Sequence, residues 1–151
     1  MIELVPIGIV RSPRVSLDDH HWGEVASAIE LDAALPGDAL DGIEDFSHAE
    51  IIFVFDRVPP ANIVRGARHP RDNPAWPRVG IFAQRGSVRP NRLGATIVRV
   101  ARRDGRTLHV LGLDAADGTP VVDIKPVMAE FLPRAAVHQP AWSHEVMRHY
   151  W

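Results

Sequence analysis

The sequence predicts an all-β protein, a small closed or partly open β-barrel with short peripheral helices, including one at the C-terminus. Thirteen prolines and eleven glycines in 151 residues indicate many short elements joined by turns. Asp104-Gly105 and Asp117-Gly118 are tight-turn signals, and each lies between apolar runs with the composition of strands. Because little of the chain has helical periodicity, a barrel built from these strands is favoured.

The first half of the chain contains three expected strands. Residues 2–10 and 24–31 are two of them, and they flank a polar segment, residues 14–23, that we expect to be a mobile loop. Apolar residues three positions apart within residues 40–46 predict a short helical turn. Residues 51–55 are apolar on both faces and rich in β-branched and aromatic side chains, which predicts a central strand buried on both sides.

The second half begins with a long proline-rich loop, residues 58–78. Residues 81–83 are a short apolar run that predicts a further strand. Residues 95–113 are expected to form a hairpin, and residues 121–124 one more strand. Near the end, apolar and aromatic residues at helical spacing within 142–150, preceded by a proline, predict a short amphipathic helix.

Length and composition suit a single domain covering residues 1–151, with 46% hydrophobic and 24% charged residues. No apolar run approaches the roughly 20 residues of a membrane helix, and the N-terminus lacks the pattern of a secretory signal. We therefore expect a cytoplasmic protein without membrane contact. The absence of cysteine excludes disulfides and cysteine-ligated zinc. No dinucleotide fingerprint, P-loop or nucleophile elbow occurs.

A stiffened arginine-rich loop between two apolar segments is the strongest functional signal. It lies within residues 80–94, where Pro90 fixes its own φ and pushes Arg89 towards an extended conformation. The loop carries three guanidinium groups and one amide, those of Arg85, Arg89, Arg92 and Asn91. Because guanidinium groups suit carboxylates and phosphates, we expect the loop to bind an anionic group. The alternative is a surface turn whose charges only face water.

Charge is unevenly distributed, although the net charge is only −2. Residues 57–106 contain twelve arginines and two acids, so the rest of the chain is strongly acidic. This asymmetry predicts a basic face and an anionic partner such as nucleic acid, with Arg68, Arg71 and Arg92 as the expected contacts. The alternative is that the basic and acidic regions neutralise each other in the folded protein.

Two further places carry side chains suited to chemistry. Asp123 and Lys125 alternate with apolar residues, so both should lie on the polar face at a strand end, as a functional pair or as an exposed ion pair. His48, just before the central strand, could exchange a proton near neutral pH or act only as a capping residue. No metal site is expected, because the histidines at 20–21 point apart in extended chain and those within 144–149 lie on different helix faces.

Several signatures occur together and in order along the chain. They are Pro6 to Pro13 (PIGIVRSP), Phe46-Ser47-His48, Gly80-Ile81-Phe82-Ala83 with Arg85, Arg89-Pro90-Asn91, and Asp117 to Pro126 (DGTPVVDIKP). In this combination the chain resembles the TsaA/TrmO family over residues 5–133. Members of that family are S-adenosylmethionine-dependent tRNA methyltransferases with a β-barrel fold.

The resemblance implies a barrel that binds S-adenosylmethionine at a homodimer interface and methylates N6-threonylcarbamoyladenosine, at N6, beside the tRNA anticodon. The cofactor-binding residues that it implies are Phe82, Ala83, Gln84, Arg85, Arg89, Pro90, Asn91, Asp117, Asp123, Ile124 and Lys125. An arginine would hold the cofactor carboxylate, and Asp117 or Asp123 would take the ribose hydroxyls or face the sulfonium. His48 or Asp123 would act as the catalytic group that removes a proton from the acceptor nitrogen.

Two alternatives to a tRNA methyltransferase stay open. One keeps the enzyme and changes the acceptor to a small molecule, since Arg92-Leu93 stands where the family commonly has Pro-Ile. The other is a non-catalytic barrel that binds S-adenosylmethionine or RNA. Every version requires the Arg89 turn and the strand tip at Lys125 to share one pocket, within one chain or across two.

Overall fold

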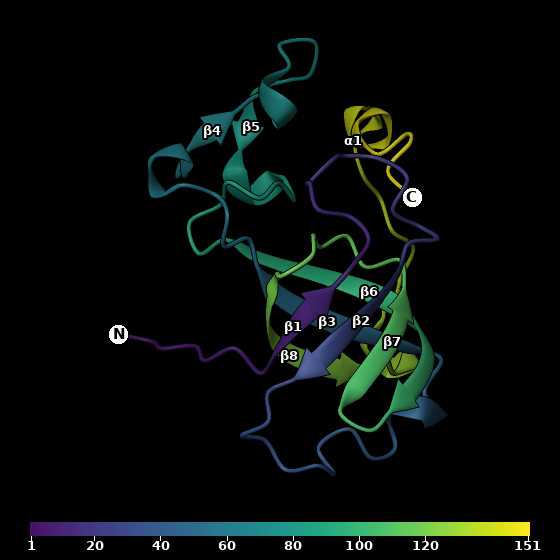
Figure 1. Cartoon of the computed structure of the whole chain (residues 1–151). Coiled ribbons are helices and arrows are strands. Elements are labelled where there is room, and N and C mark those ends of the chain that lie inside the picture. Colours follow the sequence, from purple (N-terminus) through teal and green to yellow (C-terminus); the bar gives the residue numbers. More distant parts are fainter.

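Six strands close into an antiparallel barrel (Figure 1), so the predicted all-β barrel is confirmed. The structure is a computed structural model that describes residues 1–151. Neighbouring strands follow the order β1-β2-β7-β6-β3-β8, and β8 pairs with β1. The strands are β1 (Gly8–Arg11), β2 (Ala26–Leu31), β3 (His48–Val54), β6 (Leu93–Asp104), β7 (Thr107–Leu111) and β8 (Pro120–Pro126).

The remaining elements are short and lie outside the barrel. A two-stranded ribbon, β4 (Ala67–Arg68) and β5 (Val79–Gly80), stands at the same end of the barrel as α1 (Ala141–Val146). Short 3-10 helices occur at Ile43–Asp45, Pro60–Asn62, Pro70–Asp72, Ile81–Ala83 and Ala129–Phe131. The expected peripheral helices, including the one near the C-terminus, are therefore present. None of the helices combines the length and the apolar composition that a bilayer crossing needs.

Every second side chain of the strands fills the barrel interior, because side chains alternate between the two faces of a sheet. In β3, Ala49, Ile51 and Phe53 are fully buried, while the residues between them are only half-buried. The prediction of a strand buried on both sides is therefore wrong for the outward face. Gly94, opposite Phe53 in β6, permits this packing, since a Cβ there would lie 2.5 Å from the phenyl ring.

The antiparallel register brings three long connections together at one end of the barrel, here called the loop end. They are residues 12–25 between β1 and β2, residues 55–92 between β3 and β6, and residues 112–119 between β7 and β8. The C-terminal residues 141–151 also reach the loop end, as Figure 1 shows. Backbone hydrogen bonds join them to His21 and Trp22. Most of the predicted site residues belong to these connections.

Three local expectations differ from the structure. The first strand begins at Gly8, and residues 1–6 are exposed chain without strand pairing. Ile81–Ala83 is a 3-10 turn rather than a strand, closed by a hydrogen bond from the Gln84 N–H to the Ile81 carbonyl. This turn buries Ile81 and directs Phe82 outwards. The proline-rich segment 58–78, expected to be a loop, contributes β4 and the connection to β5, which begins at Val79.

Candidate functional site

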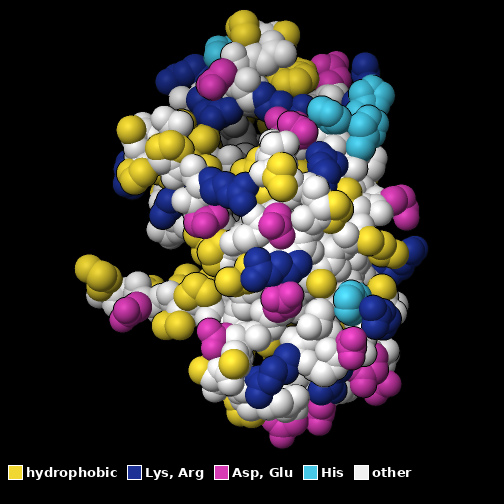
Figure 2. Space-filling view, in the orientation of Figure 1, with side chains coloured by type: hydrophobic (Ala, Val, Ile, Leu, Met, Phe, Trp, Pro, Cys, Tyr) yellow, Lys and Arg dark blue, Asp and Glu magenta, His cyan; other side chains and the backbone are white.

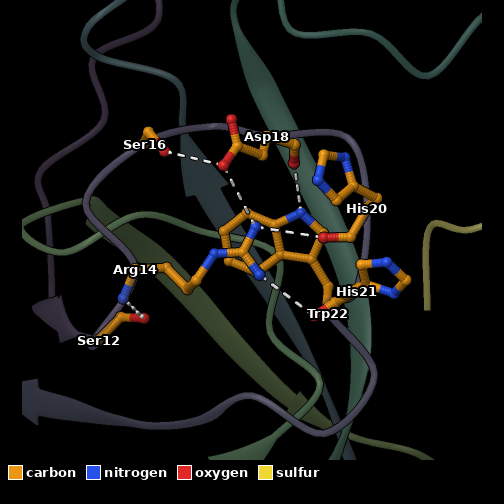
Figure 3. Close-up of polar contacts among 7 residues, drawn as sticks. All are labelled: Ser12, Arg14, Ser16, Asp18, His20, His21 and Trp22. Atoms are coloured by element: carbon orange, nitrogen blue, oxygen red, sulfur yellow. Dashed lines mark hydrogen bonds and ion pairs between the residues drawn. The ribbon is translucent and has the colours of Figure 1, made fainter.

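The segment between β1 and β2 is held in place by its own side chains. The Arg14 guanidinium lies 4.0 Å from the centroid of the Trp22 ring and donates hydrogen bonds to the carbonyl groups of His20 and His21 (Figure 3). Trp22 is buried, and its Nε1 donates to the Asp18 carbonyl at 2.6 Å. These contacts tie the segment to its own backbone, while the expected mobility of residues 14–23 stays a prediction.

Arg57 joins this loop to the barrel. It follows β3, and its guanidinium donates to the Val15 carbonyl at 2.6 Å and to the Asp117 carbonyl. Through Oδ1, Asp117 accepts a hydrogen bond from the Ser12 N–H at 3.0 Å. Asp117 thus lies at the loop end with one carboxylate oxygen engaged. Sequence reasoning missed Arg57, although a charged pair directly after a buried strand is a signal for this position.

The turn before β6 is rigid, and its arginines help to hold its shape. Arg89 donates to the Gln84 carbonyl at 2.8 Å, while Arg92, with φ 52°, donates to the Val58 carbonyl at 3.0 Å. The side-chain amide of Gln84 donates to one carbonyl group in β4 and one in β5. The guanidinium groups expected to face a ligand are therefore partly committed to the backbone. Each has five N–H donors, so donors remain for a ligand.

The neighbours of this turn differ in exposure. Phe82 is 75% exposed, although it is a large apolar residue. Ala83 and Asn91 are also exposed, and Pro90 is half-buried. An exposed phenyl ring offers a face that can stack on a planar heterocycle.

Asp123 and Lys125 form an ion pair on the outward side of β8, with 2.8 Å between Lys125 Nζ and Asp123 Oδ2. Asp123 Oδ1 also accepts the Ile124 N–H, and the Ile124 side chain packs against the barrel core. The hydrogen bond with Asp123 and its negative charge raise the pKa of Lys125, and Glu50 adds a smaller contribution. The predicted polar strand end is thus a paired acid and base.

Arg85 and Asp123 lie at two edges of one surface, here called the outer face, formed by the outward side of β8, β3 and β6. Asp123 is opposite Ile52 in β3, and Ile52 is opposite Ala95 in β6. Arg85 donates to the Ala95 carbonyl at 2.7 Å. Because neighbouring strands lie about 4.8 Å apart, about 10 Å separates the two edges. Ile97, also on this face, is 48% exposed, so apolar surface lies between the charged edges.

His48 and Asp123, the two predicted catalytic residues, do not meet within one chain. His48 begins β3, whereas Asp123 is opposite Ile52, about 13 Å further along the strand. The His48 Nδ1 is 2.7 Å from the Ser47 hydroxyl oxygen. Within one chain, His48 and Asp123 therefore cannot both contact the same atom of a substrate.

The Arg89 turn and the strand tip at Lys125 also lie apart. The turn precedes Leu93, which is opposite Val54 at the end of β3, whereas Lys125 is opposite Glu50 near its start. Four residues of β3, or about 13 Å, separate these positions. The two segments are therefore separated along β3, and a pocket that both share has to span this distance or be completed by a second chain.

The arginines of residues 57–106 are distributed over both ends of the barrel. Arg68 is only 17% exposed, and Arg71 pairs with Asp19 at 3.3 Å at the loop end. At the opposite end, Arg103 pairs with an acidic side chain at 2.6 Å. Figure 2 shows Lys and Arg side chains interspersed with Asp and Glu. Acids from the rest of the chain therefore neutralise part of the arginine surplus, which is the alternative to a basic face given above.

Sequence reasoning also missed a partly buried polar contact that holds the C-terminal segment. The Tyr150 hydroxyl donates to Asp114 Oδ2, and the Thr96 hydroxyl donates to Asp114 Oδ1 at 2.5 Å. Burial and the Asp114 carboxylate raise the pKa of Tyr150. A single acid within the apolar run 113–116 was the available signal.

Comparison with known proteins agrees with this architecture. Residues 13–131 match the family model described as the tRNA-methyltransferase O N-terminal domain. The chain belongs to this family. Among solved structures, that of TrmO from Pseudomonas aeruginosa has a TM-score of 0.75 and 26% sequence identity, covering 94% of this chain and 62% of that chain. The family resemblance inferred from the sequence is confirmed.

The curated relatives of this TrmO-family chain carry two kinds of name. A tRNA (adenine(37)-N6)-methyltransferase of Escherichia coli (strain K12) is 39% identical over 142 residues, which are 86% of this chain and 60% of that protein. The protein of the same name from Mus musculus is 38% identical over 96 residues, which are 64% of this chain and 22% of that protein. A probable S-adenosyl-L-methionine-binding protein of Archaeoglobus fulgidus is 37% identical over 131 residues, covering 83% of this chain and 34% of that protein. The chain spans less than two thirds of each of these relatives.

Proposed function

We propose that this chain is an S-adenosylmethionine-dependent methyltransferase that methylates N6 of a modified adenosine beside the anticodon of tRNA. The observation that carries the proposal is the similarity over 142 residues to a tRNA (adenine(37)-N6)-methyltransferase. The family match over residues 13–131 includes every residue proposed to bind the cofactor. A tRNA acceptor agrees with the expected cytoplasmic location. The proposal also treats residues 1–151 as one domain.

The donor groups of the outer face suit S-adenosylmethionine. Arg85 has guanidinium donors that can bind the carboxylate bidentately, Asp123 can accept the ribose hydroxyls, and the exposed Phe82 can cover the adenine. Arg89 fixes the shape of the turn that carries Arg85. When bound, S-adenosylmethionine supplies an electrophilic methyl group. The chain then has to align the acceptor and exclude water, and apolar side chains such as Ile97 on this face serve the second need.

The acceptor nitrogen must lose a proton, and we assign this step to His48. Asp123 is less suited, since its carboxylate is committed to Lys125 and to the Ile124 N–H. His48 lies about 13 Å along β3 from Asp123 in the same chain. His48 from a second copy would therefore complete the site, so the proposal includes a homodimer that pairs through the outer face. The exposed Ile97 supplies apolar surface for such a contact.

Calorimetric titration with S-adenosylmethionine tests the binding residues. We expect Arg85→Gln and Asp123→Asn each to weaken binding about tenfold or more, because a hydrogen bond to a charged group contributes about 1.5–3 kcal/mol. Arg102→Gln is the matched control, since Arg102 is exposed near the hairpin end of β6, away from the residues opposite His48 and Ile52, and its one ion pair is with the exposed Asp104. Absence of binding by the wild-type protein, or equal weakening in the control, contradicts the proposal.

Transfer of a labelled methyl group tests the acceptor. Incorporation into an adenosine of tRNA supports the proposal, while incorporation only into a small-molecule pool indicates another acceptor. Binding of the cofactor without turnover indicates a non-catalytic barrel. His48→Gln should lower kcat and leave the affinity for S-adenosylmethionine unchanged, because the imidazole acts on the acceptor. Light scattering should give twice the chain mass of 16.7 kDa for the homodimer.

A further inference from the structure

A polar hollow at the loop end contains none of the residues assigned to methyl transfer above. Its volume is about 350 Å³, and it opens between the β1–β2 loop, the segment between β4 and β5, and the C-terminal segment. We call it the histidine hollow. Its polar lining consists of three histidines, two arginines and two acids, namely His20, His21, His149, Arg71, Arg148, Asp19 and Glu145. Figure 2 shows histidine side chains gathered at this end of the molecule.

Three imidazole rings meet at the hollow. The ring centroids of His20 and His21 are 5.2 Å apart, and those of His21 and His149 are 6.3 Å apart. Arg14 binds the backbone carbonyl groups of both His20 and His21, and Figure 3 shows their rings pointing away from the Arg14–Trp22 stack. The loop that carries the rings is therefore anchored behind them, which leaves the rings free to face a ligand.

The C-terminal segment forms the opposite wall of the hollow. The His21 N–H donates to the His149 carbonyl at 2.7 Å, so the two walls are joined by the backbone. Trp76, from the segment between β4 and β5, donates from Nε1 to Glu145 Oε2 at 2.9 Å. Three segments far apart in the sequence are thus fixed around one space.

Two residues of the lining have unusual backbone conformations. His21 has φ 60° and Arg71 has φ 53°, which lie in the left-handed region that residues other than glycine seldom adopt. Such conformations cost energy and persist only where the surrounding structure fixes them. Both occur on the same hollow, so the strain coincides with the cluster of basic side chains.

The unpaired donors of the lining, rather than its net charge, suit an anion. The lining has two arginines and two acids; Asp19 is paired with Arg71 at 3.3 Å, and Glu145 accepts the Trp76 hydrogen bond. The Arg148 guanidinium and the three imidazoles have no hydrogen bond or ion pair with the protein. The structure contains no group of His, Asp and Glu side chains that could hold a metal ion. A group with several acceptor oxygens and a negative charge suits these donors.

We propose that the histidine hollow binds a phosphate group of the methyl acceptor. This inference rests on the proposed methyltransferase function. The phosphate is either a phosphodiester of an RNA strand or a phosphomonoester of a small acceptor. Gln84 links the ribbon beside the hollow to the turn that carries Arg85, so the hollow and the edge of the outer face are connected through this ribbon.

The test measures binding without S-adenosylmethionine, so that its result does not depend on methyl transfer. Isotope-labelled histidine signals are followed by NMR while inorganic phosphate, adenosine monophosphate or a short single-stranded RNA is added. The variant is Arg148→Gln with His149→Gln, which leaves the backbone contacts of the hollow in place. The matched control is Arg134→Gln with His138→Gln, the same two changes in exposed residues outside the hollow. Circular dichroism checks that both variants fold.

We expect the hollow variant to lose about tenfold in affinity for its probe and to lower the salt dependence of binding by about one phosphate contact, with the control unchanged. A response to RNA alone indicates the phosphodiester, and a response to the nucleotide indicates the phosphomonoester. Unmoved histidine signals with all three probes, or equal losses in variant and control, overturn the inference. Phosphate binding without any methyl transfer would refute the proposed function and leave this site standing.

Discussion

Tyr150 holds the C-terminal wall of the histidine hollow, and its contact with Asp114 can be tested directly. The phenol donates to one carboxylate oxygen of Asp114, and Thr96 donates to the other. Tyr150→Phe removes one hydrogen bond and keeps the ring. A hydrogen bond to a charged group contributes about 1.5–3 kcal/mol. We therefore expect the free energy of unfolding to fall by about 2 kcal/mol, which lowers Tm by about 4–8 °C in a chain of this size.

The pH dependence of this loss in unfolding free energy tests the contact between Tyr150 and Asp114 more specifically than the size of the loss does. Burial comes first among the causes that raise the pKa of Tyr150, followed by the charge and the hydrogen bond of Asp114; Asp19 adds to the rise and Arg71 opposes it. The unfolded chain ionises near pH 10. The stabilisation is therefore fully present below about pH 10 and is lost above it, at up to about 1.4 kcal/mol per pH unit.

Two measurements check this reasoning. Urea unfolding of wild type and Tyr150→Phe, between about pH 8 and pH 11, should show a stability difference that narrows above about pH 10. Tyr150 is the only tyrosine, so tyrosinate absorbance reports on this phenol alone. As the pH is raised on the folded protein, the tyrosinate absorbance should increase only at the pH at which the chain unfolds. A phenol that ionises near pH 10 in the folded state, or a constant stability difference across the range, would refute the argument.

Two other substitutions test the barrel and the loop end. Gly94→Ala places a methyl group 2.5 Å from the ring atoms of Phe53, and we expect it to destabilise the protein by about 1–3 kcal/mol in urea unfolding; unchanged stability would show that the ring moves freely. Arg57→Gln removes donors to the carbonyl groups of Val15 and Asp117, so hydrogen exchange of residues near Val15 should accelerate while β3 stays protected. Uniform acceleration throughout the barrel would contradict a local role.

The strands were predictable because short-range patterns determine them. The β6–β7 hairpin follows from two apolar runs and the turn at Asp104-Gly105, where Gly105 takes φ 60°. Ile81–Ala83 was not predictable in the same way, since three apolar residues look alike in a strand and in a buried turn. The turn buries Ile81 and leaves the next residue, Phe82, exposed. That choice depends on tertiary packing, which a local pattern does not contain.

The candidate site was predictable in its residue types but not in its spatial grouping. Asp123 and Lys125 are neighbours on one strand, so their pairing follows from alternation alone. His48 and Asp123 were grouped by chemistry, yet the register of β3 and β8 keeps them about 13 Å apart. Register between distant strands depends on how the barrel closes. The histidine hollow was missed for the same reason, because its three walls come from segments more than forty residues apart.

Hydrogen bonds to the backbone determine which arginine side chains stay available to bind an anion. Loops at the barrel end lack ladder partners, and buried carbonyl groups need donors. Seven of the twelve arginines in residues 57–106 donate to backbone carbonyl groups, so much of the apparent basic character supports the fold. An anion is therefore best held where basic side chains lack such partners. Arg148 and the three imidazoles of the histidine hollow meet that condition, although Arg148 lies outside the arginine-rich segment that first indicated an anionic partner.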